Sequence, residues 1–112
     1  MTEGIKLDEG KVRLDLIPTE AVMSIGRGLT EGHKKYGPRN WEQGMDWGRV
    51  YGAAQRHLWK WWSGIDIDEE TGLSHLDCAI VNLAFLITYQ SRGIGKDDRP
   101  QHKEQELPVE SK

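Results

Sequence analysis

Two histidines enclose a short acidic segment, and these residue types together can bind a metal ion. His57 precedes the segment, Asp68 and Glu70 lie within it, and His75 follows it. If the flanking stretches are antiparallel helices, the segment folds over their junction and the four side chains converge. Carboxylates suit magnesium or manganese, and imidazoles shift the preference toward manganese or another transition ion. We predict that Asp68, Glu70 and His75 bind a divalent metal, Mg2+ or Mn2+. We also predict that His57 and Glu70 are catalytic, with His57 as a ligand or general base. The alternative is a solvated acidic loop.

A run of charges near the N-terminus suits the binding of phosphate. Lys6, Lys11 and Arg13 are positive, and Asp15 follows them. In an extended segment Lys11, Arg13 and Asp15 project to one side. Cations beside a metal would neutralise a triphosphate, and Arg56 adds another. We predict that these five residues bind substrate, whereas the alternative is an ordinary solvated arm.

The stretch from residue 35 to residue 41 combines cations, aromatic rings and an amide. Asn40 could hydrogen-bond a base edge, Tyr36 or Trp41 could stack on the base, and Lys35 adds a charge. Asn82 lies in an apolar stretch, where its amide needs partners. We predict that all five residues bind substrate. Alternatively, Trp41 fills the core and Asn82 belongs to a satisfied core network.

These residues must be positioned by helices. Pro18 suits the first turn of a helix, which should end by Gly37, and Asp46 is a good N-cap for a second helix ending at Ser63. A third helix is expected from about Ser74 to residue 90. It is apolar on nearly every side, which is typical of a central or interface helix. We predict an all-α small helical bundle with an N-terminal extended arm over residues 1–17.

Length and composition set further bounds. The 112 residues suit one domain, which we place at residues 1–92, followed by a disordered tail over residues 93–112. A net charge of −3 argues against binding of duplex nucleic acid. The single cysteine, Cys78, the polar N-terminus and the short apolar runs indicate a cytoplasmic protein without membrane contact. An apolar helix of this kind in so short a chain predicts a homo-oligomer.

Several blocks of the sequence resemble one family when they are read in order. They are Gly4 to Pro18, Lys35 to Trp41, Arg56 with His57, Trp61 to His75, and Asn82. The family is the phage-type dATP/dGTP diphosphohydrolase N-terminal domain. The resemblance implies a helical, MazG-like nucleoside triphosphate pyrophosphohydrolase of phage nucleotide metabolism, acting in the cytoplasm of the host cell.

The resemblance and the candidate site together predict a metal-dependent hydrolase. It would convert a purine deoxynucleoside triphosphate, dATP or dGTP, into the monophosphate and pyrophosphate. The alternative is a non-catalytic phage protein that binds or sequesters a nucleotide, which would use the same basic and aromatic residues without needing Asp68 and Glu70. A helical adaptor, in which these polar residues are incidental, is a third possibility.

Overall fold

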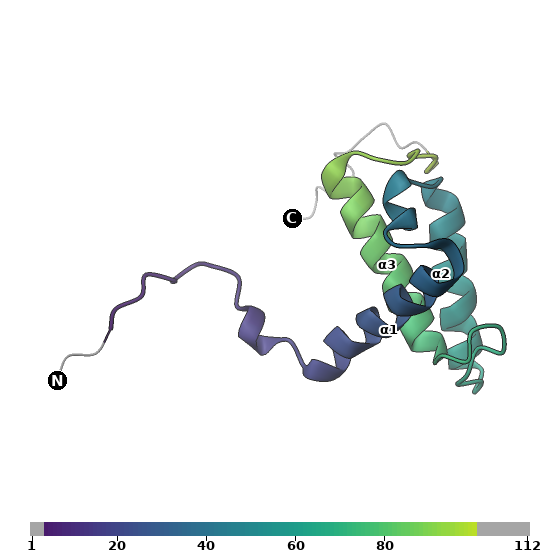
Figure 1. Ribbon diagram of the computed structural model, residues 1–112, viewed down its shortest axis with the longest axis horizontal. Helices are drawn as coiled ribbons and strands as arrows, with labels where there is room; N and C mark the ends of the chain where they lie inside the picture. The colour runs from purple at the N-terminus through teal and green to yellow at the C-terminus, as the bar shows by residue number, and fades with distance from the viewer. Residues whose placement is uncertain (1–3, 101–112) are drawn as a thin grey trace, which may run out of the picture.

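The structure is a computed structural model that describes residues 4–100. Within this range the chain forms three α-helices, α1 (Thr19–Tyr36), α2 (Trp47–Trp62) and α3 (His75–Arg92), and two short 3-10 helices, η1 (Leu14–Leu16) and η2 (Asn40–Gln43). α3 is central: α2 lies antiparallel beside it and α1 crosses it (Figure 1). The described residues contain no strand, only isolated bridges. The predicted all-α bundle is therefore confirmed.

The helices begin and end close to the predicted residues. Pro18 precedes α1, and Gly37 ends it with a φ of 90°, a conformation that favours glycine. The hydroxyl of Ser74 accepts the N–H of Leu76 at 3.0 Å and so caps α3. Asp46 stands at the predicted N-cap of α2, but its side chain makes no capping bond. Asp98 takes that role instead, since its carboxylate accepts the N–H of Gly48 at 2.7 Å.

The small core is centred on α3. Its fully buried members include Tyr89, whose hydroxyl donates to the carbonyl of Trp41 at 2.7 Å and ties η2 to α3. α1 approaches α3 closely at Gly28, where a Cβ atom would lie 2.7 Å from Cβ of Val81. A side chain at position 28 would hold these helices apart, so glycine sets their separation here.

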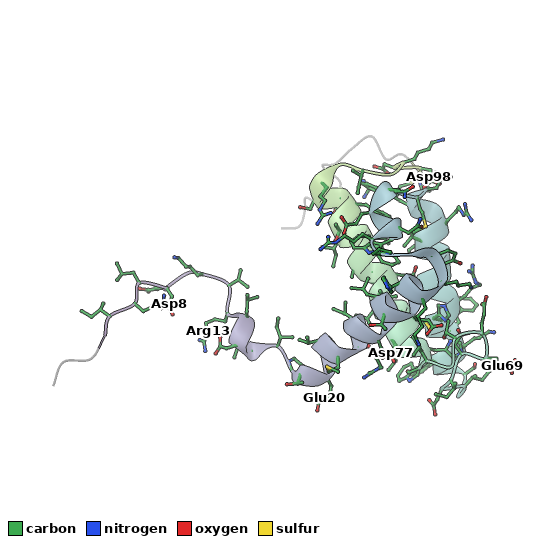
Figure 2. All side chains as sticks on the ribbon, viewed as in Figure 1. Asp8, Arg13, Glu20, Glu69, Asp77 and Asp98 are labelled. Carbon is green, nitrogen blue, oxygen red and sulfur yellow. The ribbon has the colours of Figure 1, made fainter. Side chains whose placement is uncertain are left out.

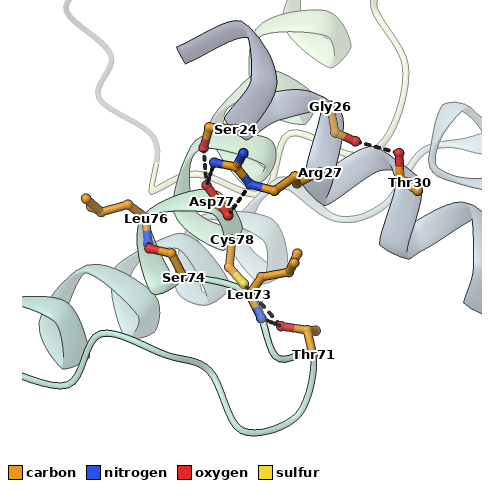
Figure 3. Close-up of polar contacts among 10 residues, drawn as sticks. All are labelled: Ser24, Gly26, Arg27, Thr30, Thr71, Leu73, Ser74, Leu76, Asp77 and Cys78. Carbon is orange, nitrogen blue, oxygen red and sulfur yellow. Dashed lines mark hydrogen bonds and ion pairs between the residues drawn. The ribbon is translucent and has the colours of Figure 1, made fainter. Parts of the chain in front are cut away.

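A buried carboxylate also joins α1 to α3. Asp77 is 5% exposed and accepts hydrogen bonds from the hydroxyl of Ser24 and from two nitrogens of Arg27, at 2.8 and 3.0 Å (Figure 3). The Arg27 guanidinium lowers the pKa of Asp77 below its ordinary value, against the effect of burial. This network fixes the position of α1 along α3, which matters because both helices line the same cavity.

The chain stays packed beyond the predicted end of the domain at residue 92. The indole of Trp47 donates to the carbonyl of Ile94 at 3.0 Å, and the backbone N–H of Trp47 donates to the carbonyl of Lys96 at 2.9 Å. With the Asp98 cap, these bonds hold residues 93–98 against the start of α2. Within the predicted disordered tail, residues 101–112 lie outside the described residues.

The predicted N-terminal arm extends away from the helices. Figures 1 and 2 show it leading outward from the start of α1, with Asp8 and Arg13 far from the bundle. It bends at a turn in which the N–H of Lys11 donates to the carbonyl of Asp8 at 3.0 Å. None of the described helices is long and apolar enough to cross a membrane.

Candidate metal centre

Three of the predicted metal-site residues meet where α2 ends and α3 begins. Nδ1 of His57 lies 2.8 Å from Nδ1 of His75. His57, Asp68 and His75 each offer one ligand atom, and these three atoms all lie within 4.8 Å of one another. Bonds of about 2.0–2.2 Å to a shared ion would place its ligands about 3–4 Å apart. Two imidazoles and a carboxylate therefore fit one divalent ion with small shifts.

The loop between the helices holds Asp68 in place. Its own backbone closes it: the N–H of Asp68 donates to the carbonyl of Leu73 at 2.8 Å, and the N–H of His75 donates to the carbonyl of Asp66 at 2.8 Å. Oδ2 of Asp68 accepts the hydroxyl of Thr71 at 2.7 Å and its N–H at 3.1 Å. Thr71 thus positions the carboxylate, and because both bonds end on Oδ2, neither occupies the other oxygen.

The protonation states at this cluster suit metal binding. Burial lowers the pKa of His57, so its ring is neutral and can act as a ligand at neutral pH. Burial of Asp68 favours its protonated form, but hydrogen bonds from Thr71, together with electrostatic attraction to the nearby histidines, outweigh that effect and lower its pKa. A neutral imidazole beside an ionised carboxylate is the state that a divalent ion requires.

The cluster borders a cavity of about 770 Å³. α1, η2 and α3 form most of its wall, and His57 and the Asp68 loop form one end. Trp41 stacks on Phe85 within the lining, with ring centroids 4.8 Å apart. This volume lies within the usual range for small-molecule pockets, about 300–1,000 Å³.

The cavity gathers most of the predicted catalytic and base-binding residues. Its lining includes His57, Asp68, Glu70, Lys35, Tyr36, Asn40, Trp41 and Asn82. Glu70 is set apart from the three-residue cluster: its side chain is 75% exposed and lies 3.6 Å from Nζ of Lys35. The amide of Asn82 donates to the carbonyl of Cys78 at 2.8 Å, so its nitrogen has a partner within α3.

The predicted phosphate-binding residues are mostly elsewhere. Lys6, Lys11, Arg13 and Asp15 lie on the arm, where Arg13 pairs with Asp15 at 2.8 Å. Arg56 is exposed on α2 and is not part of the cavity lining. His75 is nearly fully buried, and it meets His57 and Asp68 without lining the cavity. The structure thus brings His57, Asp68 and His75 together beside the base-binding residues, but it leaves Glu70 outside that cluster and the arm away from the cavity.

Sequence reasoning missed two functional candidates. Thr71 positions Asp68, and the Asp-x-x-Thr spacing of a local turn could have indicated it. Arg39 and Glu42 both line the cavity, and the Arg39 guanidinium lies 2.6 Å from the Glu42 carboxylate. The described lining holds four acids, Glu31, Glu42, Asp68 and Glu70, against one lysine and one arginine. A polyphosphate would need an added cation there.

The fold and site define a class: a small all-α domain with a three-ligand candidate metal centre beside an open cavity. The chain belongs to the family described as dATP/dGTP diphosphohydrolase, N-terminal, whose model matches residues 1–99. It is 38% identical over 96 residues to a protein of Salmonella phage PMBT28 named dATP/dGTP diphosphohydrolase. That match covers 86% of this chain and 33% of the relative, so the chain spans about a third of that protein's length. No solved structure matches it.

Proposed function

We propose that this domain carries the metal-dependent active site of a dATP/dGTP diphosphohydrolase. The observation that supports this most is the meeting of His57, Asp68 and His75 at the edge of a cavity of nucleotide size. The family name and the printed activity of the phage relative point to the same substrate class. The reaction adds water across one phosphoanhydride bond of a purine dNTP and releases the monophosphate and pyrophosphate.

The charge of the cavity explains why a metal would be needed. A triphosphate entering a lining with more acids than lysines and arginines would be repelled. His57, Asp68 and His75 would hold a divalent ion, which would supply positive charge to the phosphates and lower the pKa of a water bound to it. Imidazole nitrogens favour manganese or another transition ion over magnesium at such a cluster.

Residues of the cavity would bind the phosphates and the base and would accept a proton. Lys35, now paired with Glu70, can turn to a phosphate oxygen, because both side chains are largely exposed. Glu70 is then released to accept a proton from the attacking water. Tyr36 and the Trp41–Phe85 stack offer ring faces to the base, and Asn40 offers an amide to its edge.

The first test measures product and metal binding together. The protein should convert dATP or dGTP to the monophosphate with Mn2+ or Mg2+, and the metal should raise its melting temperature. Asp68→Asn should abolish turnover and most of that rise, since it removes the anionic ligand. Asp66→Asn is the matched control: it is an exposed acid of the same loop, and its backbone, not its side chain, bonds His75.

The outcomes separate the enzyme from a binding protein. Loss of product in Asp68→Asn with retained nucleotide binding supports a catalytic metal centre. Tight nucleotide binding by the unmodified protein with no product and no need for metal would instead assign a sequestering role. Equal effects of the two substitutions would mean that loop charge, not ligation, matters.

A further inference from the structure

A line of residues on α3 connects the metal cluster to the aromatic rings of the cavity. Cys78, Asn82 and Phe85 are spaced by four and then three residues, so their side chains share one side of the helix, and all three line the cavity. Sγ of Cys78 lies 4.0 Å from Oδ2 of Asp68, at the metal end. Phe85 stacks on Trp41 at the aromatic end. Asn82 lies between these ends, about 6 Å along the helix from Cys78 and about 4.5 Å from Phe85.

The orientation of the Asn82 amide is fixed by its own helix. Its Nδ2 donates to the carbonyl of Cys78 at 2.8 Å. The reverse orientation would place two oxygens against each other, because a carbonyl oxygen accepts hydrogen bonds and cannot donate them. Oδ1 therefore points away from the Cys78 carbonyl, and no donor among residues 4–100 bonds it. Asn82 is half-buried, so this oxygen is an acceptor that a ligand in the cavity can satisfy.

A nucleotide that spans the two ends of this line places its sugar beside Asn82. In the proposed function the phosphates meet the metal at the Asp68 end, and the base meets the rings of Trp41 and Phe85. The sugar joins the base to the phosphates and so lies between them. In the deoxyribose of such a nucleotide the 3′-hydroxyl is the hydrogen-bond donor, since the ring oxygen can only accept. An acceptor held in a fixed orientation at this point matches that hydroxyl.

We propose that Asn82 recognises the sugar of the nucleotide by accepting a hydrogen bond from its 3′-hydroxyl. This inference rests on the proposed function, because the direction of the bound nucleotide is taken from it. A nucleotide without that hydroxyl would leave Oδ1 of Asn82 covered and unsatisfied. The site therefore discriminates against 2′,3′-dideoxynucleotides. Ribonucleotides keep the 3′-hydroxyl, so Asn82 does not reject them.

The test compares the binding of dAMP, which has no anhydride bond to cut, with that of 2′,3′-dideoxy-AMP. Titration calorimetry with Mn2+ present measures both. The unmodified protein should bind dideoxy-AMP about tenfold more weakly, because one hydrogen bond is lost and its acceptor stays unsatisfied. Asn82→Leu removes the amide at similar volume. It should bind dAMP about tenfold more weakly than the unmodified protein does, and it should bind the two nucleotides equally. Such non-additive losses identify a direct contact.

Thr88→Val is the matched control for this substitution. The Thr88 hydroxyl donates to the carbonyl of Ala84, four residues earlier on α3, at 2.9 Å, as the Asn82 amide does to Cys78. Thr88 is not part of the cavity lining. Thr88→Val should therefore keep the affinity for dAMP and the tenfold preference over dideoxy-AMP. Equal losses in Thr88→Val and Asn82→Leu would mean that the bond within the helix matters, and would overturn the proposal.

Three further results would also overturn it. The first is an unmodified protein that binds no dAMP, and the second is an Asn82→Leu variant that keeps the full preference for dAMP. The third is coupling of Asn82 to the 6-amino group instead, measured with purine 2′-deoxyriboside monophosphate, which would assign Asn82 to the base.

Hydrolysis of dATP is measured separately. If dATP is hydrolysed while Asn82→Leu keeps the preference for dAMP, the sugar contact is wrong and the proposed function stands. If the losses are non-additive but no dATP is hydrolysed, the sugar contact stands and the proposed function is wrong.

Discussion

The Asp68 carboxylate shows how one neighbour can set up a metal ligand. Thr71 donates to it through both its hydroxyl and its backbone N–H, and the hydroxyl also accepts the N–H of Leu73 at 3.2 Å. Sequence order alone predicted that His57, Asp68, Glu70 and His75 would converge, and of these four Glu70 lies apart from the other three. It could not show Thr71 as the support or the Lys35–Glu70 pair, because both depend on the path of the loop.

Thr71 is a positioning residue in this arrangement, and its hydroxyl can be removed. Thr71→Val should weaken Mn2+ binding by about 10–100-fold, the usual effect of losing a partner that orients a ligand. Titration calorimetry with Mn2+ alone measures this. Thr71→Ser keeps the hydroxyl and should restore affinity. A serine variant as weak as the valine variant would show that the methyl group's packing matters instead.

The buried Asp77 predicts how stability depends on pH. Because its pKa in the folded protein lies below the ordinary 3.8, its stabilising effect is present above that value and is lost as pH falls through the lower folded pKa. Asp77→Asn should lower the free energy of unfolding at pH 7 by about 1.5–3 kcal/mol. It should also flatten the loss of stability below pH 4. Urea unfolding at several pH values, with Glu20→Gln as an exposed control, checks both effects.

At the level of elements, residues near the helix ends predicted where the helices lie, but the sequence did not predict that the segment after α3 is packed. Pro18, Gly37 and Ser74 act within one turn of a helix end. They therefore indicate where a helix begins or ends even when the tertiary fold is unknown. Residues 93–98 are held by backbone bonds, one indole and one carboxylate. Such contacts leave no apolar periodicity in the sequence, so the segment was predicted to be disordered.

The crossing of α1 and α3 depends on the missing side chain at Gly28. Gly28→Ala should lower the free energy of unfolding by about 1–3 kcal/mol, because its Cβ would overlap Val81. Gly26→Ala meets nothing within 4 Å and should stabilise α1 by up to about 1 kcal/mol. Adding Val81→Ala to Gly28→Ala should cost less than the sum of the single changes. Strict additivity would show that the close approach does not set the crossing.

For the whole molecule, the arm poses the main question. It carries Lys6, Lys11 and Arg13 away from the cavity, and η1 packs on none of the helices. The sequence predicted its extended form from glycines and alternating charges. It could not indicate where the arm lies relative to the site, since a segment without its own packing has no fixed direction until it binds something.

Arg13→Ala tests whether the arm binds phosphate. Loss of one charge-assisted hydrogen bond costs roughly 1.5–3 kcal/mol, so triphosphate affinity should fall at least about tenfold. The melting temperature should stay nearly unchanged, because Arg13 pairs only with the exposed Asp15 in the described part of the chain. Unchanged affinity would identify the arm as an ordinary solvated segment.

The left-handed backbone at Arg39 limits how the sequence can vary. Among residues 4–100 it is the non-glycine residue with a positive φ, 57°, a conformation that costs an ordinary residue about 1–2 kcal/mol. Arg39→Gly should therefore stabilise the fold by about 1 kcal/mol while removing a cation from the cavity wall, so nucleotide affinity should fall. Directed evolution for heat resistance alone would favour glycine here, and selection for nucleotide binding would favour arginine. Parallel selections on a library at position 39 would reveal whether these two demands conflict.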